Sequence, residues 1–317
     1  MNQGRYATSW KQAAPVPSGL VATARSVFRH ALLSTLSSAN TSLEDSFLRC
    51  LYCHYVFDDQ RDAFECLLLE LKRIGEFVDT ATCVQMLRED KVIDGKYYHL
   101  SFDDGFRNNY TNALPILQKH KVPCIFFVPS FLVGASYERT ATYCSEATGY
   151  GAAIEMLNWE DLRDIVSSGY EVGSHTKTHA RFSDISRDSD LLRDEILGSK
   201  TELEMHLGVE CKYISWPYGR PTDSDDASLE ATRLAKYRAC FSASRGTVRP
   251  VRTDIFRIPR HHFEVQWPIS HIKYFARGNM EVTQRESTFR HRTGAGAVLS
   301  RFGLDRGGRG EGDRAVE

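Results

Sequence analysis

Two short polar segments, about seventy residues apart, each follow directly on a strand-like run. The first reads Ser-Phe-Asp-Asp-Gly at 101–105 and closes the aromatic and apolar run 96–102. The second reads Gly-Ser-His-Thr-Lys-Thr-His at 173–179 and follows the short run 170–172. Parallel strands end at one edge of a sheet or one rim of a barrel. If these strands are parallel, both polar segments therefore lie on the same rim.

Strand-like and helix-like segments alternate through the middle of the chain. Apolar and aromatic runs predict strands at 47–57, 96–102, 124–128, 170–172, 213–216 and 239–242. Helical spacing predicts helices at 64–73, 80–88, 112–118, 159–168, 188–207 and 227–236. Asn158 is expected to cap the helix 159–168, and Gly208 to end the helix 188–207. This alternation is typical of an α/β barrel or an open parallel sheet.

The two polar segments offer a donor set that suits a divalent metal. They contain two adjacent carboxylates, Asp103 and Asp104, and two imidazoles, His175 and His179. One carboxylate and two imidazoles would bind the ion and leave an open position for the attacking water, with the second carboxylate beside it. The alternative is two unrelated loops, because Asp-Asp-Gly is common in turns and histidines fall at this spacing by chance.

A third segment reads Trp-Pro-Tyr-Gly at 216–219 and ends an apolar run. Alone it is an ordinary exit from a strand into a turn. Taken in order, however, the three segments resemble the motifs of the polysaccharide deacetylase family, metal-dependent enzymes that remove acetyl groups from N-acetylated sugars. The resemblance runs from about residue 64 to about residue 263. It implies an α/β fold, a distorted (β/α) barrel of about seven strands, in a single catalytic domain that we place at 46–276.

The resemblance also implies a role for each residue of the three motifs. Asp104, His175 and His179 are the implied metal ligands, for Zn²⁺ or another divalent transition metal. Asp103 is then the general base, since a carboxylate beside a dication stays ionised. The backbone amide of Tyr218 is the implied oxyanion donor for the tetrahedral intermediate.

The family further uses a late histidine as the acid that protonates the leaving amine. His261 and His262 are the candidates, in the sequence Phe-Arg-Ile-Pro-Arg-His-His-Phe at 256–263, and we prefer His261. The alternative is that both are surface histidines after a terminal strand. The Asp-x-Trp motif that supports the acid in other members is not evident in this sequence.

One departure from the family pattern concerns the partner of the base. Many members carry an arginine two residues before the proline of the third motif, Pro217, where this chain has Ser215. Arg260 or Arg257 is a candidate replacement for that arginine. We also place Pro217, Tyr218 and Arg260 among the predicted substrate-binding residues.

The leading functional prediction is a hydrolase that deacetylates an N-acetylated amino sugar of a surface polysaccharide or its precursor. Its partner is then an acetylated glycan. Rivals are another amide or ester hydrolase on the same scaffold, a non-catalytic glycan-binding protein, and a phosphatase that uses Asp103 as nucleophile. The long segment 134–158 is expected over the cleft, where Tyr137, Tyr143 and Tyr150 either stack on sugar rings or pack the loop down.

Charge and apolar pattern limit the other partners and the compartment. Forty basic and forty-one acidic side chains nearly cancel, which argues against nucleic acid as a partner. No apolar run approaches the ~20 residues of a membrane span, and oligomeric state stays open.

No signal peptide is visible, so the cytoplasm is expected. The N-terminal extension 1–45 lacks acidic residues before Glu44, which is also typical of a transit peptide, although a helix packed on the barrel is favoured. The segment 277–317 is expected to be a disordered tail rich in glycine and arginine.

The eight cysteines are scattered, and several lie in apolar runs, which favours reduced core thiols over a disulfide framework. The sequence Cys-Leu-Tyr-Cys-His at 50–54 matches the haem-attachment pattern of c-type cytochromes. It lies inside the expected first strand, so the strand interpretation is favoured. A zinc knuckle would need a second cysteine pair at short spacing, which is missing.

Overall fold

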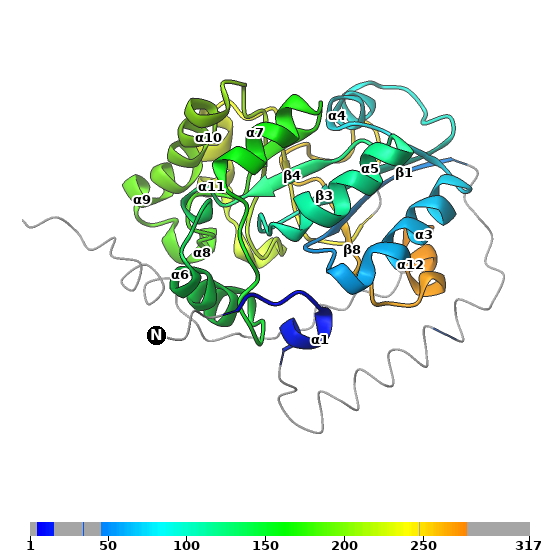
Figure 1. The fold of residues 1–317 in the computed structure, drawn as a ribbon. Helices are drawn as coiled ribbons and strands as arrows, with labels where there is room; N and C mark the ends of the chain where they lie inside the picture. The colour runs from blue at the N-terminus through cyan, green and yellow to red at the C-terminus, as the bar shows by residue number, and fades with distance from the viewer. Residues whose placement is uncertain (1–4, 16–33, 35–45, 247, 278–317) are drawn as a thin grey trace, which may run out of the picture.

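A curved sheet of parallel strands lies at the centre of the computed structural model, which describes residues 5–15, 34, 46–246 and 248–277 (Figure 1). Along the sheet the strand order is β7-β6-β5-β4-β3-β1-β8, and β2 pairs with β3 beside this path. The strands are β1 (Phe47–Cys53), β2 (Glu76–Phe77), β3 (Lys96–Phe102), β4 (Ile125–Val128), β5 (Glu171–Ser174), β6 (Tyr213–Ser215), β7 (Ala239–Phe241) and β8 (His261–His262). Seven parallel strands along a curved path confirm the predicted distorted barrel.

Helices surround the sheet, and α3, α5 and α7 lie over its outer face (Figure 1). The helices are α1 (Trp10–Ala13), α3 (Arg61–Lys72), α4 (Thr80–Arg88), α5 (Leu114–His120), α6 (Tyr137–Thr142), α7 (Trp159–Ser167), α8 (Phe182–Ile185), α9 (Ser189–Arg193), α10 (Ser199–Leu207), α11 (Asp226–Leu234) and α12 (Ile269–Ala276). Short π-helical turns precede α5, follow α6 and join α9 to α10: η2 (Asn109–Ala113), η4 (Tyr143–Thr148) and η5 (Asp194–Gly198). None of the described helices is both long enough and apolar enough to cross a membrane.

Local signals in the sequence define several helix ends. The Asn158 side chain accepts a hydrogen bond from the Asp161 amide and caps α7 as predicted, because a free carbonyl satisfies one of the unpaired amides there. Gly208 ends α10 with φ of 69°, a conformation that glycine adopts at little cost. The helix expected over 188–207 is continuous but contains the π-helical turn η5.

Side chains on each strand alternate between the barrel interior and the helix layer. On β4, Phe126 packs with the helices of the outer layer, whereas Ile125 and Phe127 belong to the cluster inside the barrel. On β3, Leu100 and Phe102 likewise face outward. The intervening positions on β3 therefore point into the barrel, since successive side chains on a strand face opposite sides.

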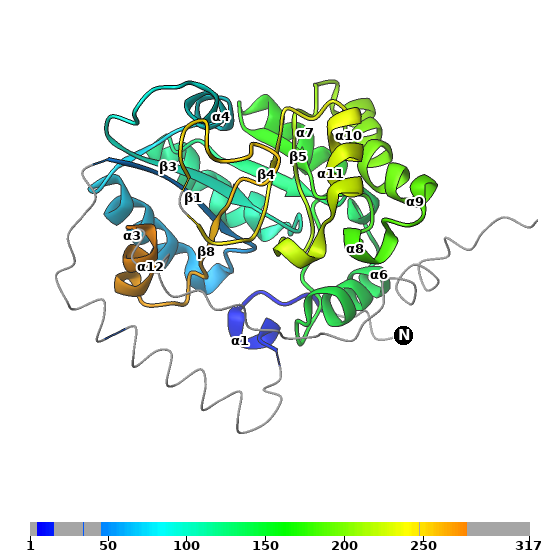
Figure 2. The ribbon, with the colours of Figure 1, turned by 180° about the vertical axis from the view of Figure 1, so that it is seen from behind.

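One extended stretch, 258–262, joins the two ends of the curved sheet. Ile258 forms a parallel bridge with Phe241 of β7, and β8 then pairs with β1 only three residues further on. Figure 2 shows this part of the chain, yellow to orange, running across the sheet. Because the stretch contacts both edges, its middle residue, Arg260, lies inside the barrel, where it is fully buried.

The segments outside the strands and main helices differ in part from expectation. The stretch 134–158 is partly helical rather than a plain loop, since α6 and η4 lie in it. At the N-terminus, Trp10 of α1 stacks on Tyr55 with ring centroids 5.4 Å apart. Of the N-terminal extension 1–45, the structure describes only 5–15 and Ser34, and the predicted tail beyond Arg277 lies outside the described residues.

Candidate active site

The three predicted metal ligands lie together at the carboxyl end of the sheet. The Nε2 atoms of His175 and His179 lie 3.5 and 3.3 Å from Oδ1 of Asp104. All three side chains are buried, and one donor atom from each lies within 4.8 Å of the others. Asp104 follows β3 and the histidines follow β5, so the common rim expected from the sequence does bring the two polar segments together.

The backbone around this group is held in the left-handed region. Asp104, Thr176, His179 and Tyr218 have φ values of 71°, 64°, 66° and 61°. Such angles cost a residue other than glycine about 1–3 kcal/mol each and persist only where the surroundings enforce them. These four residues follow β3, β5 and β6. Their left-handed backbone turns the side chains at the ends of the three strands toward one another.

Neighbouring groups orient the ligands in a way that fits a divalent ion. Nδ1 of His175 donates to the carbonyl of Ser215 over 2.7 Å, which leaves Nε2 with its lone pair toward Asp104. The Tyr143 hydroxyl donates to Oδ1 of Asp104 over 3.0 Å. A carboxylate and two imidazoles with such partners match a zinc-type donor set with an open position. These residues therefore fit the group that the sequence predicts.

The charges of the group are set by burial and by nearby imidazoles. Burial would raise the pKa of Asp104, but His54 and the two ligand histidines lower that pKa well below its usual value. Burial lowers the pKa of His179, against the opposing effect of Asp104. An ionised carboxylate and a neutral imidazole are the protonation states that bind a metal.

Asp103 is held by Arg260 in a fully buried ion pair. Nη1 and Nη2 of Arg260 donate to the two carboxylate oxygens over 2.8 and 2.7 Å. The remaining guanidinium hydrogens go to Ser101 Oγ, Ser215 Oγ and the Ser242 carbonyl at 3.0, 2.6 and 2.8 Å. All five donors of the guanidinium are thus used. Burial would raise the pKa of Asp103, but Arg260 lowers it below its usual value, so the carboxylate stays ionised.

Of the two roles expected for Arg260, the structure supports that of partner to Asp103. The guanidinium is fully buried and does not line the cavity, so it orients Asp103 rather than contacting substrate. Ser215 occupies the position where the family arginine was expected, and its hydroxyl accepts one of the Arg260 bonds. Arg257, the other candidate, pairs with exposed Asp226 instead.

A cavity of about 180 Å³ opens directly onto these groups. Its lining residues come from several strand ends and from the segment 147–150: Tyr52, His54, Asp103, Asp104, Ala147, Thr148, Tyr150, His175, His179, Trp216, Tyr218 and Ala243. Tyr218 lies in this lining as predicted, whereas Pro217 does not. Of the three tyrosines in the segment 134–158, only Tyr150 lines the cavity, because Tyr143 is buried behind Asp104 and Tyr137 packs on Tyr6.

His54 is a cavity residue that the sequence reasoning missed, whereas His261 does not line the cavity. His261 is buried beside Leu51, which belongs to the core under the helices, and it is absent from the cavity lining. His54 follows β1 and packs against the ring of His262, with centroids 4.9 Å apart. The signal was present in the Cys-Leu-Tyr-Cys-His segment, since a histidine at the end of the first strand must reach the same rim as Asp103.

A single buried carboxylate holds the loop that carries His175 and His179. Oε2 of Glu195 accepts hydrogen bonds from the amides of Lys177 and Thr178 at 3.1 and 2.9 Å, and Oε1 accepts from the Thr178 hydroxyl at 2.5 Å. Glu195 lies in the π-helical turn η5, a deformation that often marks functional sites. The turn thus directs this carboxylate at the ligand loop.

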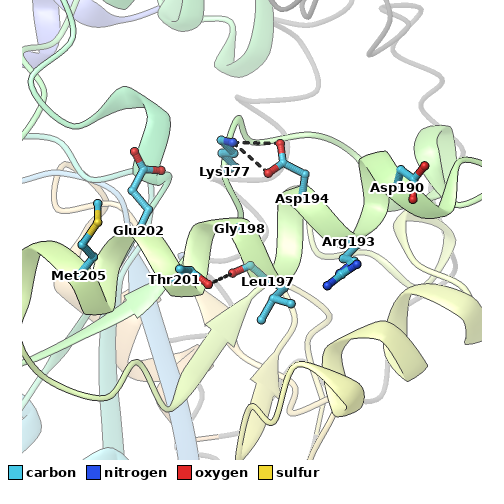
Figure 3. A pocket seen from close by; sticks show the side chains of 9 residues that line it. All are labelled: Lys177, Asp190, Arg193, Asp194, Leu197, Gly198, Thr201, Glu202 and Met205. Carbon is cyan, nitrogen blue, oxygen red and sulfur yellow. Dashed lines mark hydrogen bonds and ion pairs between the residues drawn. The ribbon is translucent and has the colours of Figure 1, made fainter. Parts of the chain in front are cut away.

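A larger groove of about 630 Å³ lies on the outer side of the same loop (Figure 3). Lys177 spans it with an ion pair to Asp194, both oxygens at 2.9 Å from Nζ, as the dashed lines in Figure 3 show. None of the predicted catalytic or metal residues lines this groove. Its size therefore does not make it the reaction site, which is the smaller cavity with the ionised and metal-binding groups.

The chain is similar to known proteins across this site. A model described as Polysaccharide deacetylase matches residues 90–240. A poly-beta-1,6-N-acetyl-D-glucosamine N-deacetylase of Staphylococcus aureus is 24% identical over 169 residues, which is 51% of this chain and 52% of that protein. The enzyme of the same name from Escherichia coli is 22% identical over 205 residues, 55% of this chain and 28% of that one. The chain thus spans about half or less of these relatives.

Solved structures share the fold. IcaB from Ammonifex degensii superposes with a TM-score of 0.60 at 24% identity, over 75% of this chain and 100% of that one. The Streptococcus pyogenes deacetylase PplD in complex with acetate has a TM-score of 0.57 at 18% identity, over 73% and 98% of the two chains. At these identities the likeness concerns the fold alone.

Replacing Glu195 tests whether it positions the ligand loop. In Glu195→Gln an NH₂ group replaces one of the two oxygens that accept hydrogen bonds from the ligand loop, and NH₂ cannot accept them. The loop should then hold the histidines less firmly, and the affinity for zinc should fall by about 10–100-fold. Asp194→Asn is the matched control, because the Lys177–Asp194 pair is half exposed and should contribute little. Competition titration with a zinc chelator measures both. Equal affinities in the two variants would remove Glu195 from this role.

The turn that carries Tyr218 depends on a close backbone approach at Gly219. Gly219 and Gly208 have nearly equal φ angles, 67° and 69°. A Cβ atom added at Gly219 would lie 2.2 Å from the Ala243 nitrogen, whereas a Cβ added at Gly208 would have none of the described atoms within 4 Å. Both alanine variants bear the left-handed cost of roughly 1 kcal/mol, and Gly219→Ala should lose about 1–3 kcal/mol more. Urea unfolding measures the free energy of unfolding of both variants. Equal losses would mean that the backbone around Gly219 moves to accommodate the methyl group.

Proposed function

We propose that the chain is a polysaccharide deacetylase, of the family whose model matches residues 90–240, and that it hydrolyses the N-acetyl amide of amino sugars in a surface polysaccharide. The observation that carries the proposal is the cavity itself. It joins an ionised carboxylate, Asp103, to a three-ligand metal group and to a separate imidazole, His54. Amide hydrolysis needs a base, a carbonyl-polarising centre and an acid for the amine, and these groups supply one of each.

Asp104, His175 and His179 would hold the divalent ion, which we propose to be zinc. When bound there, the ion polarises the acetyl carbonyl and brings the pKa of water down toward neutral. The Tyr143 hydroxyl and the Ser215 carbonyl keep a carboxylate oxygen and an imidazole nitrogen oriented for it. The chain needs no movement of these side chains to present three donors.

Asp103 acts as the general base. It accepts a proton from the attacking water while the water oxygen bonds to the acetyl carbon. The paired guanidinium keeps the carboxylate ionised before the reaction, and its two hydrogen bonds hold both oxygens in one orientation. Because Arg260 has no donor left for substrate, it contributes through Asp103 alone.

His54 acts as the general acid. It donates a proton to the amide nitrogen as the carbon–nitrogen bond breaks, so that acetate and a free amino sugar are released. The ring is supported by Tyr52 at 5.5 Å and by His262 at 4.9 Å between centroids. Burial, together with the adjacent His54, lowers the pKa of His262 well below its usual value, so His262 stays neutral and serves as a support.

The cavity walls suit a sugar that carries an acetamido group. Tyr52, Tyr150, Trp216 and Tyr218 offer aromatic surface around the reacting groups. The oxyanion of the tetrahedral intermediate would accept a bond from the Tyr218 amide, in the left-handed turn at the end of β6. The relatives named poly-beta-1,6-N-acetyl-D-glucosamine N-deacetylases support a polymer of N-acetylglucosamine as the substrate class.

The direct test is acetate release from N-acetylglucosamine oligomers by zinc-loaded protein. Activity should appear with metal, vanish with a chelator and return when zinc is restored. Asp103→Asn should keep the metal and lose on the order of 10²–10⁴-fold in turnover. Hydrolysis of acetyl esters without any amide hydrolysis would favour an esterase. Oligomer binding with no hydrolysis of either substrate would favour the glycan-binding alternative.

The assignment of the acid is tested with matched amide and ester substrates. An amine leaves poorly unless protonated, so His54→Gln should lower amide hydrolysis by about 10²-fold or more and ester hydrolysis less. His261→Gln should change the two rates by the same factor, because that ring lies outside the cavity. Rates on both substrates for both variants provide the comparison. An amide-selective loss in His261→Gln alone would restore the assignment made from the sequence.

A further inference from the structure

A second group of metal-type donors lies inside the barrel, away from the cavity. Cys50, Cys83 and His99 are each buried, and one donor atom from each lies within 4.8 Å of the others. The two sulfur atoms are 3.7 Å apart. In the part of the chain that the structure describes, this is the one such group besides the ligands of the candidate active site.

The fold brings these three donors together by two independent constraints. Cys50 of β1 and His99 of β3 are direct partners in the parallel register, so their side chains lie next to each other on the same face. Cys83 comes from α4, whose start is set by the Asp79 cap. Cys50 and Cys83 belong to the cluster inside the barrel, and the ring of His99 stacks on Phe241 of that cluster at 5.0 Å.

The separation of the sulfur atoms is the one that a tetrahedral zinc ion would impose. With zinc–sulfur bonds of about 2.3 Å, two thiolates at the tetrahedral angle lie roughly 3.8 Å apart. The observed 3.7 Å matches this value. It is far longer than the ~2.05 Å of a disulfide, and all eight cysteines are free.

The imidazole has the surroundings of a ligand. Nε2 of His99 is hydrogen-bonded to the Thr80 hydroxyl over 3.1 Å, while Nδ1 is buried and has no hydrogen-bond partner in the structure. A ligating histidine characteristically uses its other nitrogen in such a bond, which fixes the tautomer and the ring. A buried ring nitrogen without a partner is costly unless something binds it.

We propose that Cys50, Cys83 and His99 form a second, structural site for a thiophilic divalent ion, zinc, that fastens α4 to β1 and β3. The site would lie beneath the catalytic groups. The inward positions run from His99 and Ser101 of β3 to Asp103 just after the strand, and the Ser101 hydroxyl oxygen accepts a hydrogen bond from Arg260. An ion at His99 therefore supports the strand that presents the base, without contact to substrate.

Cobalt substitution distinguishes the two sites by their ligands. Protein stripped of metal and loaded with Co²⁺ should show a thiolate-to-cobalt charge-transfer band in the near ultraviolet, which a carboxylate–imidazole site does not produce. The band should persist in the double variant His175→Ala, His179→Ala and disappear in Cys83→Ser. Cys53→Ser is the matched control, a buried cysteine on the outward face of β1 that should leave the band intact.

Zinc content measured by elemental analysis gives a second readout that does not depend on activity. The parent should retain two zinc ions per chain after free metal is removed, and Cys83→Ser or the double histidine variant should each retain one. Cobalt-loaded parent protein without the charge-transfer band would overturn the proposal, and this measurement needs no variant to fold. A band that survives in Cys83→Ser, or a Cys50–Cys83 disulfide found in the freshly purified protein, would overturn it as well.

Discussion

The buried pair between Arg260 and Asp103 is the interaction on which the architecture of the site depends. Two charges inside a barrel are costly unless every hydrogen-bonding group is satisfied, and here the guanidinium makes five hydrogen bonds to four residues. Removing either partner of such a pair typically costs about 3–5 kcal/mol, because the other charge is left buried. The pair also joins β3 to the stretch 258–262. A group that orients the base therefore also holds the closing stretch of the barrel in place.

Much of the framework was predictable because it rests on local patterns. Continuous apolar and aromatic runs located β3 and β4, and the helix over 80–88 was placed correctly because its apolar spacing is regular. The two polar segments after β3 and β5 could be assigned to one rim, since parallel strands must end together. The π-helical turns were not predictable, because each depends on what the helix packs against rather than on its own sequence.

The parts of the site that the sequence missed or left open are those that depend on contacts between distant strands. His54 lies about fifty residues before Asp103, and Arg260 more than 150 residues after it. Only the pairing of β1 with both β3 and β8 brings His54 and Arg260 close to Asp103. The choice between His261 and His262 met a related limit. Alternation along a strand says that neighbours point apart, but it does not say which of the two points inward until the partner strand is known.

The closing stretch 258–262 has a consequence for how the protein acquires its site during synthesis. Chains emerge from the N-terminus, and β1, β3 and the ligand loop are complete long before Arg260 leaves the ribosome. Until then Asp103 lacks its guanidinium partner, and burying the carboxylate without that partner would be unfavourable. The nascent barrel is therefore expected to stay open along the edge between β1 and β7. The last stretch to be synthesised closes the barrel and brings Arg260 to the Asp103 carboxylate.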